Sequence, residues 1–401
     1  MIATNSNLNK KNFFRNFCFL CRSKTKTIIY EQLKLYHFGK KKIGYGICSK
    51  CGLVMQTISP TIKELINFYK QNFYFEDFKK PKKNKVESIK RQIRMIKQEL
   101  DIFPESVLEV SLMSIYNLLQ FKKEGAKILH GIEPSVVLNN KIKKKFNIKI
   151  FNDVIENFKS KINYDLILMS HVLEHLHDPK KALIQCYKNQ KVGQKVLAEV
   201  PLFDRTDLYP PSGLNVEHLY YFDEFNFVKM LNTCGYEVLV VEKIYKSNHL
   251  PFLSVLAEKK SKKNLIKQNE TNYRAQIIQL NNYKRKITEI YKRVNQVLAK
   301  LDKNKPTYLF GSGFTASNFI FYTKVEKKFD ISGILDNSKV KQNKFLCGIK
   351  IKKPYKNEIL NSNIIITSIG SNQNIMDQFR EIKSNINFYG FDKNFYFKKL
   401  N

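Results

Sequence analysis

The sequence has no long apolar run and no tract rich in glycine, proline or serine. No run approaches the roughly 18 residues that a membrane-spanning helix needs. The first residues, MIATNSNLNKKNFF, do not read as a secretion signal. An apolar fraction of 43% over 401 residues is enough for two or three domains with at least one sizeable core. We therefore expect a globular protein without a membrane span, located in the cytoplasm.

Acidic residues are scarce: 35 Asp and Glu stand against 70 Lys and Arg, which gives a formal net charge of +35. The basic residues are mostly lysines scattered over every segment, without the arginine clusters that bind phosphates and bases. This distribution favours solvated lysine surfaces and disfavours nucleic acid as a partner. Attraction to something anionic, either a nucleotide-linked substrate or nucleic acid, is the alternative interpretation.

Glycine is missing where a nucleotide-binding loop needs it. Residues 107–135 read VLEVSLMSIYNLLQFKKEGAKILHGIEPS: a strand ending in an acid, a tight loop, a helix, and a second strand ending in an acid. This frame is the first βαβ unit of a nucleotide-binding sheet, whose loop is normally rich in glycine. The sequence therefore raises the question whether the chain still binds the cofactor that this frame usually holds.

Four of the seven cysteines lie in the first 60 residues, in two CxxC hooks. Cys18 and Cys21 form the first hook, and Cys48 and Cys51 form the second. Two hooks supply four thiolates, which complete a tetrahedron around zinc and leave no open position for water, so we expect a structural ion. A redox pair or disulfides are the alternatives, and the cytoplasm disfavours disulfides. The remaining cysteines lie in apolar contexts typical of buried packing residues: Cys186, Cys234 and Cys347.

Strands and helices alternate from about residue 106 to residue 259. The predicted strands are VLEV, KILHGIE, YDLILMS, KVLAEVP and YEVLVVEKI, which indicate an α/β sheet of mostly parallel order. Residues 261–304 repeat apolar side chains at helical spacing and predict a long amphipathic helix that links two bodies. From Thr307 a second strand–loop–helix, TYLFGSGFTASNFIFY, begins another α/β body.

Polar residues at the carboxyl ends of the central strands are the candidate cofactor ligands, because ligands of open α/β sheets bind there. Glu109 ends the first strand. Glu133 ends the second, where an acid commonly binds ribose hydroxyls. Asp153 follows the next short strand, near the expected place of an adenine. Ser111 in the loop and Ser170 at the end of the fourth strand complete the set.

The order of motifs along the chain resembles a known family. Two CxxC hooks ending in CSKCGLV precede a Tyr-rich segment, and then GIEPS, HVLEHLHDP, KVLAEVP and VEHLYYF follow. This order resembles that of the three-part S-adenosylmethionine-dependent sugar C-methyltransferases over nearly the whole chain. The resemblance implies an α/β protein with a small N-terminal zinc domain, a class I methyltransferase domain of Rossmann-like fold and a second Rossmann-like domain at the C-terminus.

We accordingly expect five segments: a zinc-binding domain, a helical connector, the methyltransferase domain, a helical linker and the C-terminal domain. Their expected bounds are 1–60, 61–100, 101–260, 261–305 and 306–401. In this family the methyl donor is S-adenosylmethionine and the substrate is a nucleotide-linked keto-sugar.

The sequence departs from the family in the first loop, where the three glycines of the family correspond to Ser111, Met113 and Ile115. Glycine lets the backbone approach the methionine end of the cofactor and adopt turn angles that a Cβ disfavours. Ser111 adds little bulk, whereas Met113 and Ile115 need space that the cofactor would use. We expect a rearranged loop that still binds the cofactor; a pocket that no longer binds it is the alternative.

The resemblance implies that His218, in NVEHLYYFD, is the general base, with Glu217 beside it. Methylation of a sugar carbon requires removal of a proton α to a carbonyl, and histidine titrates near neutrality. A tyrosine that follows the zinc domain also reaches the family's site, and Tyr74 and Tyr69 are the candidates. A purely structural role for EHLYYF is the alternative.

The segment HVLEHLHDP gathers His171, Glu174, His175 and His177. Imidazole and carboxylate are zinc ligands, but the acid stands at the wrong offset for an HExxH motif. Class I methyltransferases commonly carry LEHLxDP as a structural loop over the cofactor, and we favour that interpretation here. His171 remains a candidate for contact with the substrate.

The C-terminal segment LFGSGFTASNF places Gly311 and Gly313 after a strand, and Asp336 ends the next strand. This is the acid spacing of a dinucleotide fingerprint and by itself indicates NAD. The resemblance implies instead that this lobe helps to enclose the sugar nucleotide without redox chemistry.

We therefore expect a methyltransferase that uses S-adenosylmethionine and a structural Zn²⁺. Its expected substrate is a nucleotide-linked keto-sugar of surface-polysaccharide or secondary-metabolite biosynthesis. Two alternatives stay open: a catalytically degenerate relative that keeps a sugar-nucleotide site, and a nucleic-acid methyltransferase. Steeply salt-dependent binding to RNA or DNA would identify the last.

Overall fold

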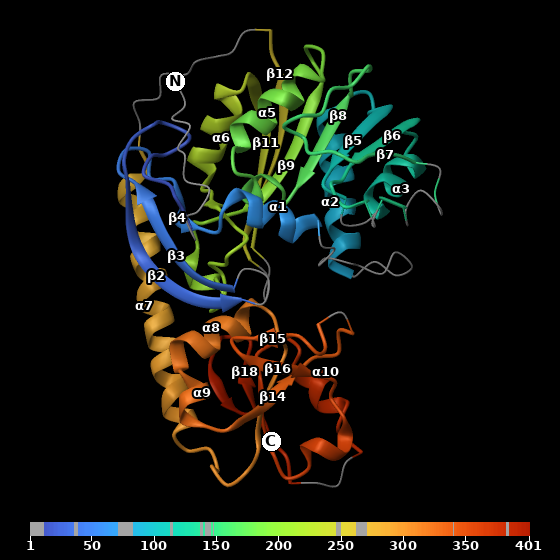
Figure 1. The fold of residues 1–401 in the computed structure, drawn as a ribbon. Helices are drawn as coiled ribbons and strands as arrows, with labels where there is room; N and C mark the ends of the chain where they lie inside the picture. The colour runs from blue at the N-terminus through green and yellow to red at the C-terminus, as the bar shows by residue number, and fades with distance from the viewer. Residues whose placement is uncertain are drawn as a thin grey trace.

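The computed structural model describes residues 12–35, 39–70, 83–112, 115–136, 139–140, 146, 148–245, 250–261, 271–339, 341–381 and 385–401. The chain forms three sheets in succession, and Figure 1 shows them as an N-terminal sheet, a central body and a C-terminal body. A long helix, α7 (Tyr273–Leu298), runs along one side from the N-terminal sheet to the C-terminal body (Figure 1).

The N-terminal sheet is antiparallel, in the order β1-β4-β3-β2. Its strands are β1 (Phe13–Phe14), β2 (Thr25–Leu35), β3 (Gly39–Cys48) and β4 (Val54–Ser59). A fifth strand, β10 (Tyr220–Tyr221), comes from the middle of the chain and pairs with β4, with Tyr220 opposite Met55 and Tyr221 opposite Val54. Backbone hydrogen bonds therefore join the N-terminal sheet to the segment that carries the EHLYYF motif.

The central sheet has the order β11-β12-β9-β8-β5-β6-β7. Its strands are β5 (Ser106–Val110), β6 (Ile128–Ile132), β7 (Lys149–Phe151), β8 (Leu166–Ser170), β9 (Lys195–Pro201), β11 (Tyr236–Ile244) and β12 (Phe252–Lys259). The first five are parallel, and β12 lies antiparallel between β9 and β11. The chain winds outward from β5 in both directions, so the carboxyl ends beside β5 form the switch point at which ligands bind. This is the strand order of class I methyltransferases.

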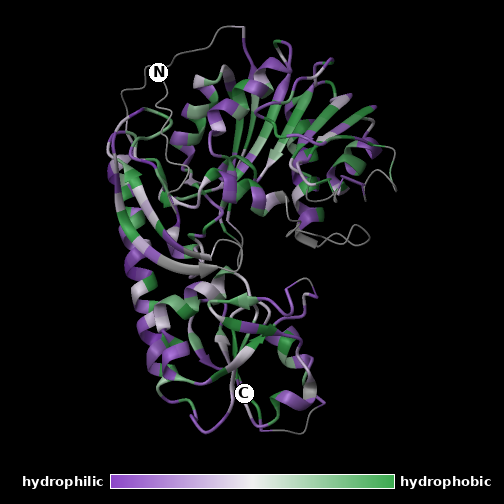
Figure 2. Ribbon diagram, in the orientation of Figure 1, coloured by the Kyte–Doolittle hydropathy of each residue, from purple (hydrophilic) through white to green (hydrophobic). Residues whose placement is uncertain are grey.

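Both faces of the central sheet are buried. Leu166 and Leu168 of β8 pack in one cluster with α2 (Lys83–Glu99) and α3 (Tyr116–Lys123). Ile167 and Met169 of the same strand pack in another cluster with α5 (Pro179–Lys188) and α6 (Glu224–Thr233). Because side chains of a strand alternate between faces, a strand covered on both sides reads as the continuous apolar run LILM. Figure 2 shows these strands as the hydrophobic interior of the central body.

The C-terminal sheet has the order β15-β16-β14-β13-β17-β18-β19. Its strands are β13 (Thr307–Phe310), β14 (Ile331–Leu335), β15 (Phe345–Leu346), β16 (Ile349–Lys352), β17 (Asn363–Ile366), β18 (Asn387–Phe391) and β19 (Phe397–Lys399). The five inner strands are parallel and the two edge strands antiparallel. The parallel strands keep the Rossmann order 3-2-1-4-5. The helices of this body are α8 (Phe314–Thr323), α9 (Val325–Lys328), η3 (Lys356–Ile359) and α10 (Asn372–Asp377).

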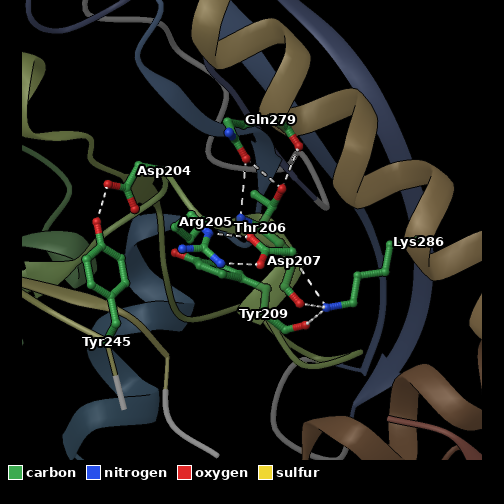
Figure 3. A network of polar contacts seen from close by, with 8 residues as sticks. All are labelled: Asp204, Arg205, Thr206, Asp207, Tyr209, Tyr245, Gln279 and Lys286. Carbon is green, nitrogen blue, oxygen red and sulfur yellow. Dashed lines mark hydrogen bonds and ion pairs between the residues drawn. The ribbon is translucent and has the colours of Figure 1, made fainter. Parts of the chain in front are cut away.

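Helix α7 is fixed to the central body by a polar network around η2 (Thr206–Leu208) (Figure 3). The Thr206 hydroxyl donates to the side-chain oxygen of Gln279 at 2.8 Å. The Lys286 ammonium donates to the backbone carbonyls of Thr206, Asp207 and Tyr209. These carbonyls end a short helix, where cations are favourable. Burial lowers the pKa of Lys286 to about 8, so the side chain holds α7 in place at a cost in desolvation.

The fold confirms the predicted α/β organisation, and each of the five predicted central strands forms. The expected mostly parallel order holds for β5 to β9, while β12 was not predicted and lies antiparallel at the far side of the sheet. The predicted linker helix is shorter than residues 261–304, since it begins at Tyr273 and ends at Leu298. Among the described residues, no helix combines the length and apolar character needed to cross a membrane.

Candidate functional site

The N-terminal sheet positions the loop that carries His218. The Gln56 side chain on β4 donates to the backbone carbonyls of Asn215 and His218, at 2.8 and 2.9 Å. The Asn215 side chain in turn accepts the backbone N–H groups of Glu217 and His218, at 2.9 and 3.0 Å. Because Asn side chains favour such local turns, the loop is held in one conformation from both sides.

Helix α1 (Ile62–Lys70) brings Tyr69 to the same place. The helix starts with a reciprocal cap, in which Glu64 accepts the Thr61 N–H at 2.9 Å and Thr61 accepts the Glu64 N–H at 3.3 Å. Tyr69 is the penultimate residue of the helix, and its hydroxyl lies 3.0 Å from His175 Nδ1. Burial raises the pKa of Tyr69 well above its ordinary value, so the phenol stays protonated.

A buried carboxylate lies at the centre of the histidines. Glu174, in η1 (Leu173–His175), is fully buried, with His171 Nδ1 at 3.4 Å and His175 Nε2 at 3.7 Å from its Oε1. His218 packs against His175 with ring centroids 4.8 Å apart. Burial lowers the pKa of His218 to about 3, so this ring is neutral.

His171 lies directly after β8 in a left-handed conformation, with φ of 54°. Its backbone N–H is tied to the Glu199 carbonyl at 2.9 Å, while its side chain is 42% exposed. Non-glycine residues at positive φ are uncommon and concentrate at functional sites. The conformation turns the His171 side chain away from the strand direction at the carboxyl edge of the sheet.

A single cavity of about 590 Å³ joins this cluster to the carboxyl ends of β5, β6 and β7. A cavity of this size suits a cofactor or small substrate. Most of the polar residues predicted from the sequence line it: Ser111, Glu133, Asp153, His171, Glu217 and His218. Glu133 is 7% exposed and accepts the Ser135 N–H at 2.9 Å, and burial raises its pKa to about 7.

In the glycine-free loop, a serine takes the left-handed backbone conformation that glycine usually adopts. Ser111 takes φ of 63°, the left-handed conformation that glycine adopts without cost, and its N–H donates to the Ile132 carbonyl. Leu112 fills the space above Gly131, where an added Cβ would lie 2.1 Å from the Leu112 side chain. Ile115 is 1% exposed and packs in the core beneath the sheet. It takes no space from the cavity, contrary to the expectation from its bulk.

Three predicted site residues lie elsewhere or cannot be placed. Glu109 is buried and accepts a hydrogen bond from Asn117 at 2.7 Å, and it does not line the cavity. Ser170 accepts a hydrogen bond from Gln92 at 2.8 Å and also does not line it. Tyr74 lies outside the described residues. Tyr69, the other candidate tyrosine, lines the cavity.

Sequence analysis did not single out Gln56, and it interpreted the segment of His175 as a structural loop over the cofactor, whereas His175 itself lines the cavity. Both depend on contacts between segments far apart in the chain. The pairing of β4 with β10 has no signal in either segment alone.

The four N-terminal cysteines converge as predicted. The Sγ atoms of Cys18 and Cys51 are 3.7 Å apart, and those of Cys21 and Cys48 are 3.3 Å apart. Tetrahedral zinc with Zn–S bonds of about 2.3 Å requires sulfur atoms about 3.8 Å apart. The N–H groups of Leu20 and Lys50 point at Cys18 and Cys48 Sγ at 3.4 Å, as suits thiolates. The quartet therefore fits a zinc ion.

Positive φ angles close both hooks, at Arg22 (64°) and at Gly52 (78°). A Cβ at Gly52 would lie 2.7 Å from the Tyr273 backbone nitrogen at the start of α7. Glycine is therefore required at this position both by the turn and by the close approach of the helix.

Comparison with known proteins concerns the middle of the chain. Residues 74–241 match a protein family described as a methyltransferase domain. No curated protein matches the chain.

Solved structures of low sequence identity resemble the chain. One is the N-methyltransferase NodS of Bradyrhizobium japonicum in complex with S-adenosyl-l-homocysteine, 13% identical, with 49% of this chain covering 97% of that chain at a TM-score of 0.39. Another is the 1,6-didemethyltoxoflavin-N1-methyltransferase of Burkholderia thailandensis, 10% identical, with coverages of 52% and 96% and a TM-score of 0.39. A third is the magnesium protoporphyrin IX methyltransferase of Synechocystis, 10% identical, with coverages of 48% and 91% and a TM-score of 0.36.

Similarity at this level carries no argument about substrate or residue roles. The family match over residues 74–241 and the strand order of the central sheet both agree with a methyltransferase domain in the middle of the chain, and they leave its substrate open.

Proposed function

We propose that this protein transfers a methyl group from S-adenosylmethionine to a carbon atom of a nucleotide-linked keto-sugar. The observation that carries the proposal is the single cavity shared by two sets of side chains. Glu133 and Asp153 lie on the side formed by β6 and β7, and Tyr69, His171 and His218 lie on the side formed by α1, β8 and the β10 loop.

The residues on the first side fit the cofactor. Glu133 is buried at the end of the second strand, where a carboxylate accepts the two ribose hydroxyls, and Asp153 follows the third strand. Ser111 gives the loop the left-handed turn that the family obtains from glycine. S-adenosylmethionine, when bound, supplies an electrophilic methyl group on a positively charged sulfur.

The residues on the second side suit removal of a proton α to a carbonyl. The resemblance assigns this step to His218, and His171 is the cavity histidine with the more exposed side chain. His175 Nδ1 lies 3.2 Å from the Glu217 carbonyl and 3.0 Å from the Tyr69 hydroxyl oxygen, so an Nδ1–H tautomer donates to both. The Tyr69 O–H is then available to donate to a substrate oxygen.

The remaining parts of the chain support this site. The zinc-held N-terminal sheet presents Gln56, which fixes the His218 loop. Thiolate ligands stay reduced in the cytoplasm, where we place the protein. In our proposal residues 1–60, 61–100, 101–260, 261–305 and 306–401 act as zinc domain, connector, methyltransferase domain, linker and C-terminal domain.

The test is methyl transfer to a panel of nucleotide keto-sugars, followed by mass spectrometry, with calorimetry of S-adenosylmethionine binding in parallel. We expect His218→Ala to reduce turnover about 100- to 10,000-fold, as loss of a general base does, with cofactor affinity nearly unchanged. His171→Ala is the comparison variant.

Near wild-type turnover in His218→Ala with loss in His171→Ala would move the base to His171. Cofactor binding without methylation of any keto-sugar would contradict the proposed substrate. Absence of cofactor binding would support the degenerate relative.

A further inference from the structure

Helix α2 runs from the carboxyl edge of the central sheet toward its amino edge. Midway along the helix, the Gln92 side chain donates to the hydroxyl of Ser170, the last residue of β8, at 2.8 Å. Near the end of the helix, Lys97 pairs with Glu124, which follows α3 and precedes β6. The residues that precede Gln92 on the same face therefore lie beyond the carboxyl ends of the strands, where ligands of open α/β sheets bind.

Lys85 is a cation in that position. It precedes Ile89 by four residues and Gln92 by seven, and residues at these spacings share one face of a helix. Ile89 is buried in one cluster with Leu112 and Ile115, so this face of α2 packs against the glycine-free loop. Lys85 therefore lies beside that loop at the carboxyl edge of the sheet.

The charge of Lys85 is not neutralised by a close partner. The side chain is half-buried, and it makes no hydrogen bond or ion pair with the residues that the structure describes. Burial raises the pKa of Glu109 to about 7, and the charge of Lys85 opposes this rise. Desolvation lowers the pKa of His171, neighbouring carboxylates raise it above its ordinary value, and Lys85 again opposes the rise. Lys85 is therefore close to the ends of both β5 and β8.

These strand ends are where the methionine part of S-adenosylmethionine is expected. Asp153 and Glu133 suit the adenine and the ribose at the ends of β7 and β6, which leaves the ends of β5 and β8 for the remainder of the cofactor. The methionine part carries a carboxylate. The Ser111 N–H already donates to the Ile132 carbonyl. Lys181, the one lysine or arginine among the cavity-lining residues of the described ranges, lies on α5 and interacts with Glu156.

We propose that Lys85 binds the carboxylate of the methionine part of the cofactor, with the exposed Ser111 hydroxyl as a second donor. Lys85 is not among the residues that line the cavity, but the flexible four-carbon stem of a lysine allows its ammonium to turn toward a carboxylate at the edge. A hydrogen bond between two charged groups is about twice as strong as a neutral one. The contact from α2 therefore compensates for the backbone approach that a glycine-rich loop provides. The assignment rests on the proposed function for the identity of the cofactor and is independent of the sugar.

The experiment is calorimetry of the full-length protein with two probes. S-adenosylhomocysteine keeps the amino-acid part of the cofactor, and methylthioadenosine has the same nucleoside thioether without it. We expect Lys85→Met to weaken S-adenosylhomocysteine binding by about 10- to 100-fold, as loss of a hydrogen bond to a charged group does. Methylthioadenosine binding should stay nearly unchanged. Lys85→Arg should retain most of the affinity. Lys90→Met is the matched control, because Lys90 is an exposed lysine of the same helix, and it should bind both probes as the wild type does.

Unchanged S-adenosylhomocysteine affinity in Lys85→Met would overturn the assignment. Equal weakening of both probes would also overturn it, because a lysine that only supports the structure affects the two alike. Absence of S-adenosylhomocysteine binding by the wild type would refute the proposed cofactor together with this assignment. Sugar methylation plays no part in these measurements, so failure of the proposed substrate leaves the assignment standing.

A measurement on the wild type alone guards against a misfolded variant. S-adenosylhomocysteine should bind more tightly than methylthioadenosine, and this difference should shrink between about 0.05 and about 0.5 M salt, because salt screens a partly exposed ion pair. Equal affinities of the two probes at low salt would overturn the assignment.

Discussion

Two strand–loop–helix units begin two parallel sheets of this chain, and they treat glycine in opposite ways. The central unit, β5 to α3, has no glycine in its loop, and Ser111 takes the positive φ. The C-terminal unit, β13 to α8, keeps Gly311 at φ of 98°. By the usual motif, the second unit should bind a nucleotide and the first should not.

The acids that follow reverse this conclusion. Asp336, after β14, accepts both the N–H and the hydroxyl of Ser312, at 2.9 and 2.5 Å, and the Ser338 N–H at 2.8 Å. Both oxygens of its carboxylate therefore already accept hydrogen bonds from neighbouring loops of the same domain. Glu133, after β6, lines a cavity instead. Gly311 is explained by packing, because a Cβ there would lie 2.2 Å from the Ser368 Oγ. The comparison favours a cavity beside the acid, more than the number of glycines in the loop, as the sign of a ribose site.

The largest effect is expected on cofactor affinity, for which Glu133 and Asp336 should differ. Glu133→Ala should weaken S-adenosylmethionine binding by about 100-fold or more, because two hydrogen bonds to a charged group are lost. Asp336→Ala should leave the affinity unchanged. Calorimetry of both variants checks this, and equal losses would break the comparison.

Gly311→Ala should lower the free energy of unfolding by about 1–3 kcal/mol, since it adds both a close contact and an unfavourable φ. Urea unfolding measures this change. Cofactor affinity should not move. A variant as stable as the wild type would show that the loop relaxes around the added methyl group.

The pH dependence of cofactor binding should follow Glu133. Burial raises the pKa of this carboxyl to about 7, so it is largely protonated below pH 7 and ionised above. Ribose hydroxyls donate to the ionised form, so affinity should rise by at most about tenfold per pH unit up to about pH 7 and then level off. Titration calorimetry from pH 5.5 to 8.5 tests this, with Glu133→Gln as the variant that should show a flat profile.

The smallest effect concerns Ser111. Ser111→Gly removes a Cβ from a left-handed residue and should raise the free energy of unfolding by up to about 1 kcal/mol, offset in part by the flexibility of glycine in the unfolded chain. Urea unfolding measures it. A destabilised variant would mean that the serine side chain contributes more than its backbone conformation costs.

Much of the fold was predictable because its signals are local. The apolar runs of β5, β6, β8 and β9 and the turns that bound them depend on neighbours in sequence. Strand β12 was not predicted, and nothing in PFLSVLAEK indicates its antiparallel place between β9 and β11. The bulk of Ile115 suggested a conflict with the cofactor, but side-chain bulk does not tell in which direction the residue points, and Ile115 points into the core.

By itself, the sequence determined the cysteine quartet, the alternation of strands and helices, and the polar residues at the strand ends, because ligand spacing and hydrophobic periodicity act within short segments. The tertiary structure decided that β10 pairs with β4, that His218 meets Glu174 and His175, and that Asp336 is occupied while Glu133 lines the cavity. These outcomes depend on hydrogen bonds and burial between residues far apart in the chain, whose partners are settled only when the three sheets pack together.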